Sequence, residues 1–222
     1  MSRLAVLASG SGTNMQALLD AIAAGELDAE IAVVVSNRRD AGAVCKAMDA
    51  HVPTVTLPLA NRRDPMARAM FDRQLADVVE AFAPDLIVLA GWMLILGPAF
   101  LDRFPGRIVN VHPALLPNGE GSKVESSAGL APALRGARVV RDALLLGLPV
   151  TGATVHIVTP TVDAGPVILR EEVPLLPGDD EASLHARIKQ AEHRLLPRAV
   201  ALTLAHLAAH EYGHGTRRDG SE

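Results

Sequence analysis

The chain has 222 residues, of which 49% are hydrophobic and 21% charged; this is enough apolar material for a packed core and excludes wholesale disorder. A net charge of -4 and an aromatic content of 3% argue against nucleic acid as a partner, because such proteins present basic patches and aromatic platforms. Cys45 is the only cysteine, which excludes an internal disulfide. No apolar run approaches the roughly 18 residues of a membrane span, so we expect a cytoplasmic protein without a membrane partner.

Short apolar runs alternate with helical patterns through the first half of the chain. Strands are expected over residues 4–8, 31–35, 55–57, 86–90 and 108–111, and helices over residues 15–23, 41–50 and 66–82. Continuous apolar strands separated by helices are typical of a parallel sheet that is buried on both faces. We therefore predict an α/β fold with a mostly parallel central sheet and helices on both faces.

The second half of the chain is less regular. Residues 118–132 contain mainly Gly, Ser, Lys and Glu without periodicity, so we expect an irregular surface loop that is either functional or mobile. The remaining patterns predict helices over 138–146 and 182–210, strands over 153–158 and 166–173, and a polar tail over 211–222.

One motif near the C-terminus formally matches the zinc-protease pattern H-E-x-x-H. It runs from His210 to His214. Gly213 lies inside the supposed helix, and the chain after His214 is too short to supply the usual third ligand. We interpret the match as chance.

A glycine-containing loop joins the first strand to the first helix. Gly10, Gly12, Thr13 and Asn14 lie where glycines let the backbone approach an anion and where a helix offers free N–H groups. The loop lacks the third glycine of the dinucleotide fingerprint and the lysine of a P-loop. It is either a phosphate site or a tight turn capped by Thr13 or Asn14.

Two polar segments lie at strand ends. Asn110 and His112 are two residues apart, so both side chains leave the same face of an extended chain, at the carboxyl end where α/β sheets bind ligands. Asp163 lies in a turn, and a carboxylate near His112 would favour imidazolium. Each segment could equally be an ordinary hydrogen-bonded turn. His156, within a strand, is expected to be a core histidine.

Five segments together resemble the phosphoribosylglycinamide formyltransferase family, folate-dependent enzymes of purine synthesis. The segments are SGSGTN (9–14), LAGWMLIL (89–96), VNVHPALLP (109–117), TGATVH (151–156) and DAGPVI (163–168). The resemblance runs in order from about residue 3 to about residue 200. It implies a single Rossmann-like formyltransferase domain over residues 1–210, in which 118–133 is a long flexible insertion near the site.

The resemblance also implies the reaction and its residues. The formyl group of 10-formyltetrahydrofolate, the co-substrate, would pass to the amine of 5′-phosphoribosylglycinamide without a metal. The catalytic trio would be Asn110, His112 and Asp163. The phosphate and ribose would contact Gly12, Thr13, Asn14, Lys189 and Glu192. The folate would contact Arg68, Met93, Leu94, Ile95, Leu96, Asn110, Thr159 and Asp163.

The expected chemistry needs donors for a tetrahedral oxyanion and a proton for the departing N10 atom. Asn110 and protonated His112 can supply them, and Asp163 is expected to raise the pKa of His112 and to order a water. Two departures stand out. Many relatives have Arg where this chain has Leu94, and they have a shorter segment in place of residues 118–133.

Three other functions remain open at this stage. A formyltetrahydrofolate deformylase shares the same trio but usually has an additional N-terminal domain. A methionyl-tRNA formyltransferase would have a C-terminal domain and a basic surface. A non-catalytic folate- or nucleotide-binding relative could have its site blocked by the long loop. We expect small-molecule substrates and a monomer or weak homodimer.

Overall fold

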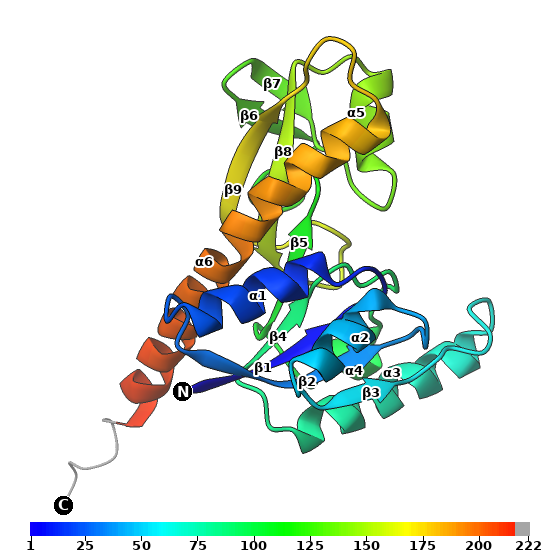
Figure 1. Ribbon diagram of the computed structural model, residues 1–222, viewed down its shortest axis with the longest axis vertical. Helices are drawn as coiled ribbons and strands as arrows, with labels where there is room; N and C mark the ends of the chain where they lie inside the picture. Colours follow the sequence, from blue (N-terminus) through cyan, green and yellow to red (C-terminus); the bar gives the residue numbers. More distant parts are fainter. Residues whose placement is uncertain (216–222) are drawn as a thin grey trace, which may run out of the picture.

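The structure is a computed structural model that describes the backbone of residues 1–215 and the side chains of residues 1–210. Figure 1 shows the chain from β1 to α6. The strands are β1 (Ser2–Leu7), β2 (Ala29–Ser36), β3 (Thr54–Thr56), β4 (Leu86–Leu89), β5 (Ile108–His112), β6 (Lys123–Ser126), β7 (Gly129–Pro132), β8 (Val150–Ile157) and β9 (Val167–Pro174). The helices are α1 (Thr13–Ala23), α2 (Gly42–Asp49), α3 (Pro65–Ala81), α4 (Pro98–Leu101), α5 (Val139–Leu145) and α6 (Glu181–Gly215).

A seven-stranded sheet runs through the molecule in the order β3-β2-β1-β4-β5-β8-β9. The five strands from β3 to β5 are parallel, whereas β8 runs antiparallel to both β5 and β9. The chain builds the sheet outward from β1 in both directions. The order therefore reverses between β1 and β4, which is where open α/β sheets hold their ligands.

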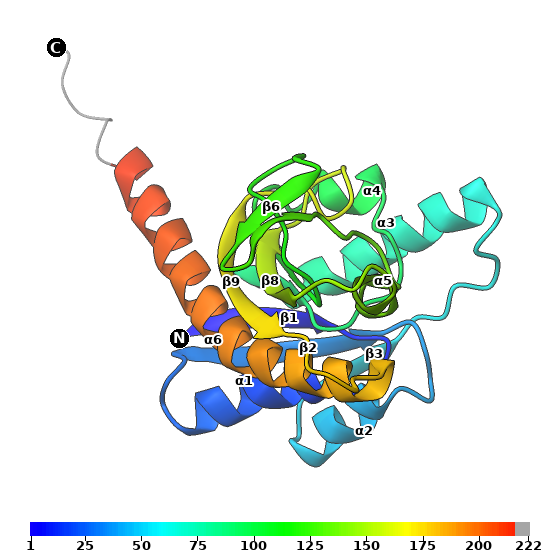
Figure 2. The same ribbon diagram turned by 90° about the horizontal axis from the view of Figure 1, so that it is seen from above.

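Helices cover both faces of the sheet, and each face has its own hydrophobic core. One core joins the sheet to α1, α2, α5 and α6, and the other joins it to α3 and α4. Figure 2 shows α1 and α6 side by side below the sheet, with α3 on the other side. The predicted α/β class, with a mostly parallel sheet between two helix layers, is confirmed.

The prediction that residues 118–132 form an irregular loop is wrong for most of this segment. Residues 123–132 form an antiparallel hairpin, β6–β7, which turns at residues 127–128, and Gly129 at the start of β7 has φ of +99°. Long-range contacts hold it in place. The Ser127 N–H donates to Glu172 Oε1 at 2.8 Å, and the Val124 side chain is buried.

The last helix is longer than the sequence predicted. It continues through Pro197 and past His210 to Gly215, so the start of the expected tail is helical. The remainder of that tail, and the side chains of the H-E-x-x-H motif after His210, lie outside the described residues. No helix in the described part of the chain is long and apolar enough to cross a membrane.

Candidate active site

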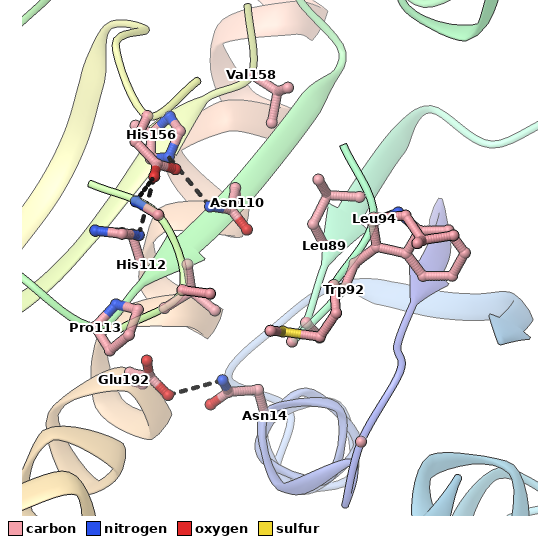
Figure 3. Close-up of a pocket in the computed structure, with 18 of the residues that line it drawn as sticks. Asn14, Leu89, Trp92, Leu94, Asn110, His112, Pro113, His156, Val158 and Glu192 are labelled. Carbon is pink, nitrogen blue, oxygen red and sulfur yellow. Dashed lines mark hydrogen bonds and ion pairs between the residues drawn. The ribbon is translucent and has the colours of Figure 1, made fainter. Parts of the chain in front are cut away.

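A cavity of about 510 Å³ lies at the carboxyl ends of β1, β4 and β5, facing the first half of α6. Figure 3 shows three groups of side chains around it: Asn14 with Glu192, then Asn110 with His112 and His156, then Leu89, Trp92 and Leu94. Of the residues predicted for the site, all but Arg68 line this cavity. The topology therefore brings five distant segments of the chain to one place.

The glycine loop after β1 forms one end of the cavity. Gly12 adopts φ of +75°, and a Cβ at this position would lie 2.6 Å from the Ala43 Cα atom, so both its conformation and its packing require glycine. No side chain caps the N-terminus of α1. The first N–H groups of the helix are thus available to an anion in the cavity, as the phosphate interpretation of this loop requires.

The last helix closes the same end. Asn14 Nδ2 donates to Glu192 Oε2 at 2.9 Å, and the Asn14 Oδ1 atom is buried without a partner among the described residues. Burial raises the pKa of Glu192, although the Asn14 hydrogen bond and the charge of Lys189 oppose the change. His185, one turn before Lys189, also lines the cavity and was not predicted from the sequence. This end offers a cation, an amide and a carboxylate to a polar substrate.

A connected polar cluster occupies the middle of the cavity. Asp163 lies between two histidines: its Oδ2 atom is 3.5 Å from His112 Nδ1, and its Oδ1 atom is 3.6 Å from His156 Nε2. His156 Nδ1 donates to the Ile157 carbonyl oxygen at 2.9 Å, so Nε2 is free to accept from Asn110 Nδ2 at 3.2 Å. The pairing of β5 with β8, which sets Asn110 opposite His156, brings these two side chains together.

The sequence interpretation assigned His156 to the core and did not place it in the site. It is buried, as a core histidine would be, but it lines the cavity and contacts both Asn110 and Asp163. The strand pattern gave no indication of this, because the antiparallel pairing with β5 is a long-range feature.

Asp163 acts to raise the pKa of His112, as expected, but burial of the ring has the larger effect and in the opposite direction. Burial lowers the pKa of this imidazole below its usual value, and the nearby Asp163 carboxylate only partly offsets that effect. Burial alone would raise the pKa of Asp163. Its contacts with His156, His112 and the Gly136 N–H outweigh burial and hold it low. Burial thus favours the neutral form of the His112 imidazole, while the contacts of Asp163 favour the ionised form of its carboxylate.

The opposite end of the cavity is apolar. Leu94 and Leu96 are buried in its wall, whereas Met93 and Ile95 leave more than half of their side-chain surface exposed. The Met93 N–H donates to Ser9 Oγ at 2.9 Å, which ties this segment to the end of β1. The side chain at 94 packs into the protein, so the segment can meet a flat ring through its backbone and its exposed side chains.

Arg68 differs in position from the other predicted site residues. It does not line the cavity, and its Nη2 atom donates to the Ile95 carbonyl oxygen at 2.5 Å from outside. Thr159, at the mouth, lines the cavity as expected. Within the part of the chain whose side chains are described, no group of three or more His, Cys, Asp or Glu residues is arranged to hold a metal ion.

Comparison with known proteins agrees with this architecture. The formyl transferase family model matches residues 2–200. Phosphoribosylglycinamide formyltransferase from Mycobacterium tuberculosis is 45% identical over 205 residues, covering 92% of this chain and 86% of the relative. The enzyme of that name from Escherichia coli is 37% identical over 198 residues, covering 89% and 85%. The crystal structure of glycinamide ribonucleotide transformylase 1 from Symbiobacterium toebii superposes with a TM-score of 0.81 at 40% identity, covering 92% and 88%.

The chain therefore belongs to the formyl transferase family. Within that family, the proteins and solved structures that it resembles are phosphoribosylglycinamide formyltransferases, and the resemblance found in the sequence is confirmed.

Proposed function

We propose that this protein transfers the formyl group of 10-formyltetrahydrofolate to the amine of 5′-phosphoribosylglycinamide. One observation carries the proposal. A single cavity presents an anion-binding helix start at one end, a carboxylate–histidine–amide cluster in the middle and an apolar wall at the other end. These are the environments that a phosphate, a reacting amine and formyl group, and a pterin ring respectively require.

The charge state of His112 supports its role as a base in the first step. The substrate amine attacks the formyl carbon, which gives a tetrahedral intermediate with a positive nitrogen and an oxyanion. A neutral His112 can accept the surplus proton, and the resulting imidazolium is stabilised by Asp163 at 3.5 Å. Because Nε2 already donates to the Leu134 carbonyl oxygen, the proton arrives at Nδ1.

The second step returns that proton. His112 gives it to N10, directly or through a water, as the bond between N10 and the formyl carbon breaks. The proton lost by the amine thus ends on tetrahydrofolate, and the enzyme is regenerated. Asn110 serves the oxyanion: one N–H of its amide is held by His156, and the other can donate to the developing charge.

The remaining assignments belong to the same proposal. Gly12, Thr13, Asn14, Lys189 and Glu192 hold the phosphate and ribose, while Met93 to Leu96 and Thr159 border the folate. Arg68 supports the folate site through Ile95. No metal takes part, the chain acts in the cytoplasm, and it is a monomer or weak homodimer. Dialysis against EDTA should leave turnover unchanged, and sedimentation velocity reports the oligomeric state.

A formyl-balance assay tests the function. Purified protein is incubated with both substrates, and formylated ribonucleotide and tetrahydrofolate are quantified by mass spectrometry, with formate measured alongside. We expect the two products in equal amounts and little formate. Formate without formylated ribonucleotide would identify a deformylase, and the absence of any product would indicate a non-catalytic binding protein. Formyl transfer to methionyl-tRNA instead would identify a tRNA formyltransferase.

A further inference from the structure

Three consecutive residues before α5 contact both members of the His112–Asp163 pair. The Leu134 carbonyl oxygen accepts from His112 Nε2 at 2.9 Å. Arg135 Nε donates to the Asp163 carbonyl oxygen at 3.0 Å, and the Gly136 N–H donates to Asp163 Oδ2 at 2.8 Å. This short segment thus fixes the imidazole, the carboxylate and the backbone that carries the carboxylate.

Asp163 is a residue that needs such support. Its φ of +51° lies in the left-handed region, which a non-glycine residue rarely adopts without external contacts. Its carboxylate must also stay between His112 and His156, at 3.5 and 3.6 Å. A rotation of this backbone would move the carboxylate away from the imidazole that it has to stabilise.

Arg135 is the only one of the three whose side chain makes the contact. Its other branch, Nη2, donates to the carbonyl oxygens of Gly121 at 2.8 Å and Gly119 at 3.2 Å. The planar guanidinium therefore spans two parts of the chain, the Asp163 turn and the approach to the β6–β7 hairpin. A fork of fixed geometry can hold two such sites at once, whereas the single ammonium of lysine cannot reproduce its directions.

We propose that Arg135 is a positioning residue: it holds the Asp163 backbone so that the carboxylate faces His112, and it anchors the 118–133 segment to the same point. The inference rests on the proposed function for its kinetic part. Arg135 acts through Asp163 and does not touch the reacting atoms.

The test compares Arg135→Lys and Arg135→Ala with the wild type and with Arg141→Ala, a control at an exposed arginine on the neighbouring helix. We expect kcat to fall about 10-fold in Arg135→Lys and by up to about 10²-fold in Arg135→Ala, as for a misplacement of a catalytic group by about 1 Å. KM for both substrates should change little, and Arg141→Ala should match the wild type. Millimolar guanidinium should partly restore Arg135→Ala, and methylammonium should not.

A second measurement does not depend on turnover. The pKa of His112 is followed by NMR titration, with the resonance assigned by its loss in His112→Asn. Asp163 raises this pKa, while His156 and Arg135 lower it. Because lysine keeps the charge at 135, a displaced Asp163 should make the pKa fall further in Arg135→Lys.

The outcomes separate the two proposals. An inactive wild type would reject the proposed function, while the NMR titration would still test the positioning of Asp163. An unchanged His112 pKa in Arg135→Lys, or a rise in KM with kcat intact, would overturn the positioning role. Equal rescue by guanidinium and methylammonium would do the same, because only the planar fork can span both sites.

Discussion

The glycine end of the cavity and the polar cluster in its middle are built in different ways. The glycine end comes mainly from one continuous stretch, in which β1 leads through Gly10 and Gly12 into α1. The polar cluster is assembled from four stretches: His112 ends β5, His156 lies on β8, Asp163 lies in the following turn, and residues 134–136 close around them. Only the first kind of site is held by local geometry.

This difference has a consequence for how each of the two parts responds to substitution. A local site is disturbed by substitutions within its own loop, which should act on the binding of one substrate. An assembled site depends on contacts between distant segments, so substitutions outside the reacting groups should also act on turnover. Four substitutions, taken from the largest expected effect to the smallest, test this distinction.

His112→Ala should have the largest effect. It removes the group that we propose accepts and returns the proton, and we expect kcat to fall by at least about 10²-fold with folding intact. Steady-state kinetics together with a thermal melt measure both quantities. His206→Ala, at an exposed histidine outside the cavity, is the control and should retain full activity. Near-normal turnover in a folded His112→Ala variant would reject the assignment.

Asp163→Asn should reduce kcat about 10-fold or more and shift its pH dependence. Asparagine tolerates the positive φ at this position, so the substitution removes charge with little change in backbone conformation. The Asp163 carboxylate raises the pKa of His112 against the effect of burial. Without it the pKa falls further, and the acid limb of the kcat profile should move to lower pH. An acid limb that stays in place would argue against the pairing.

Gly12→Ala should lower stability and weaken binding of the ribonucleotide. The left-handed conformation costs alanine roughly 1–2 kcal/mol, and the new Cβ would meet the Ala43 backbone. We expect a lower Tm and a KM that rises more for the ribonucleotide than for the formyl folate. Gly25→Ala is the matched control, since Gly25 has a similar positive φ of +74° outside the cavity, and it should lower Tm without changing either KM. Equal changes in both KM values would show that this loop is not a dedicated phosphate site.

Val124→Ala should have the smallest effect and tests whether the hairpin is seated on the protein. Its side chain is 2% exposed, so losing two methyl groups should cost about 1–2 kcal/mol. Leu130→Ala, in the same hairpin but 63% exposed, should be nearly neutral. Denaturant unfolding measures the free energy of unfolding of both variants and of the wild type. If neither variant changes the free energy of unfolding, the hairpin is a loosely attached insertion.

The same distinction explains what the sequence could predict. The parallel strands follow from continuous apolar runs, the glycine loop from one strand–glycine–helix pattern, and the shared face of Asn110 and His112 from their spacing. The antiparallel addition of β8 sets His156 against Asn110 and could not be derived from a local pattern. Likewise, whether the pKa of His112 is raised or lowered depends on how deeply the folded chain buries that ring.

The β6–β7 hairpin is a further case. Its composition lacks the alternation of a half-buried strand. The contact of Ser127 with Glu172 and the burial of Val124, which hold the hairpin on the protein, arise only in the folded chain. A weak local pattern therefore indicated irregular structure where long-range contacts impose a regular one.

The apolar end of the cavity contains the only tryptophan of the chain, and this gives the protein a built-in optical probe. The Trp92 ring is stacked with Phe71 at a centroid distance of 6.4 Å, and its Nε1 atom has no hydrogen-bond partner among the described residues. Fluorescence excited selectively from the Trp92 indole therefore reports on the surroundings of this end alone. A pterin ring bound there should quench it, while a ribonucleotide at the glycine end should leave it nearly unchanged, so the order in which the two substrates bind can be read without any turnover.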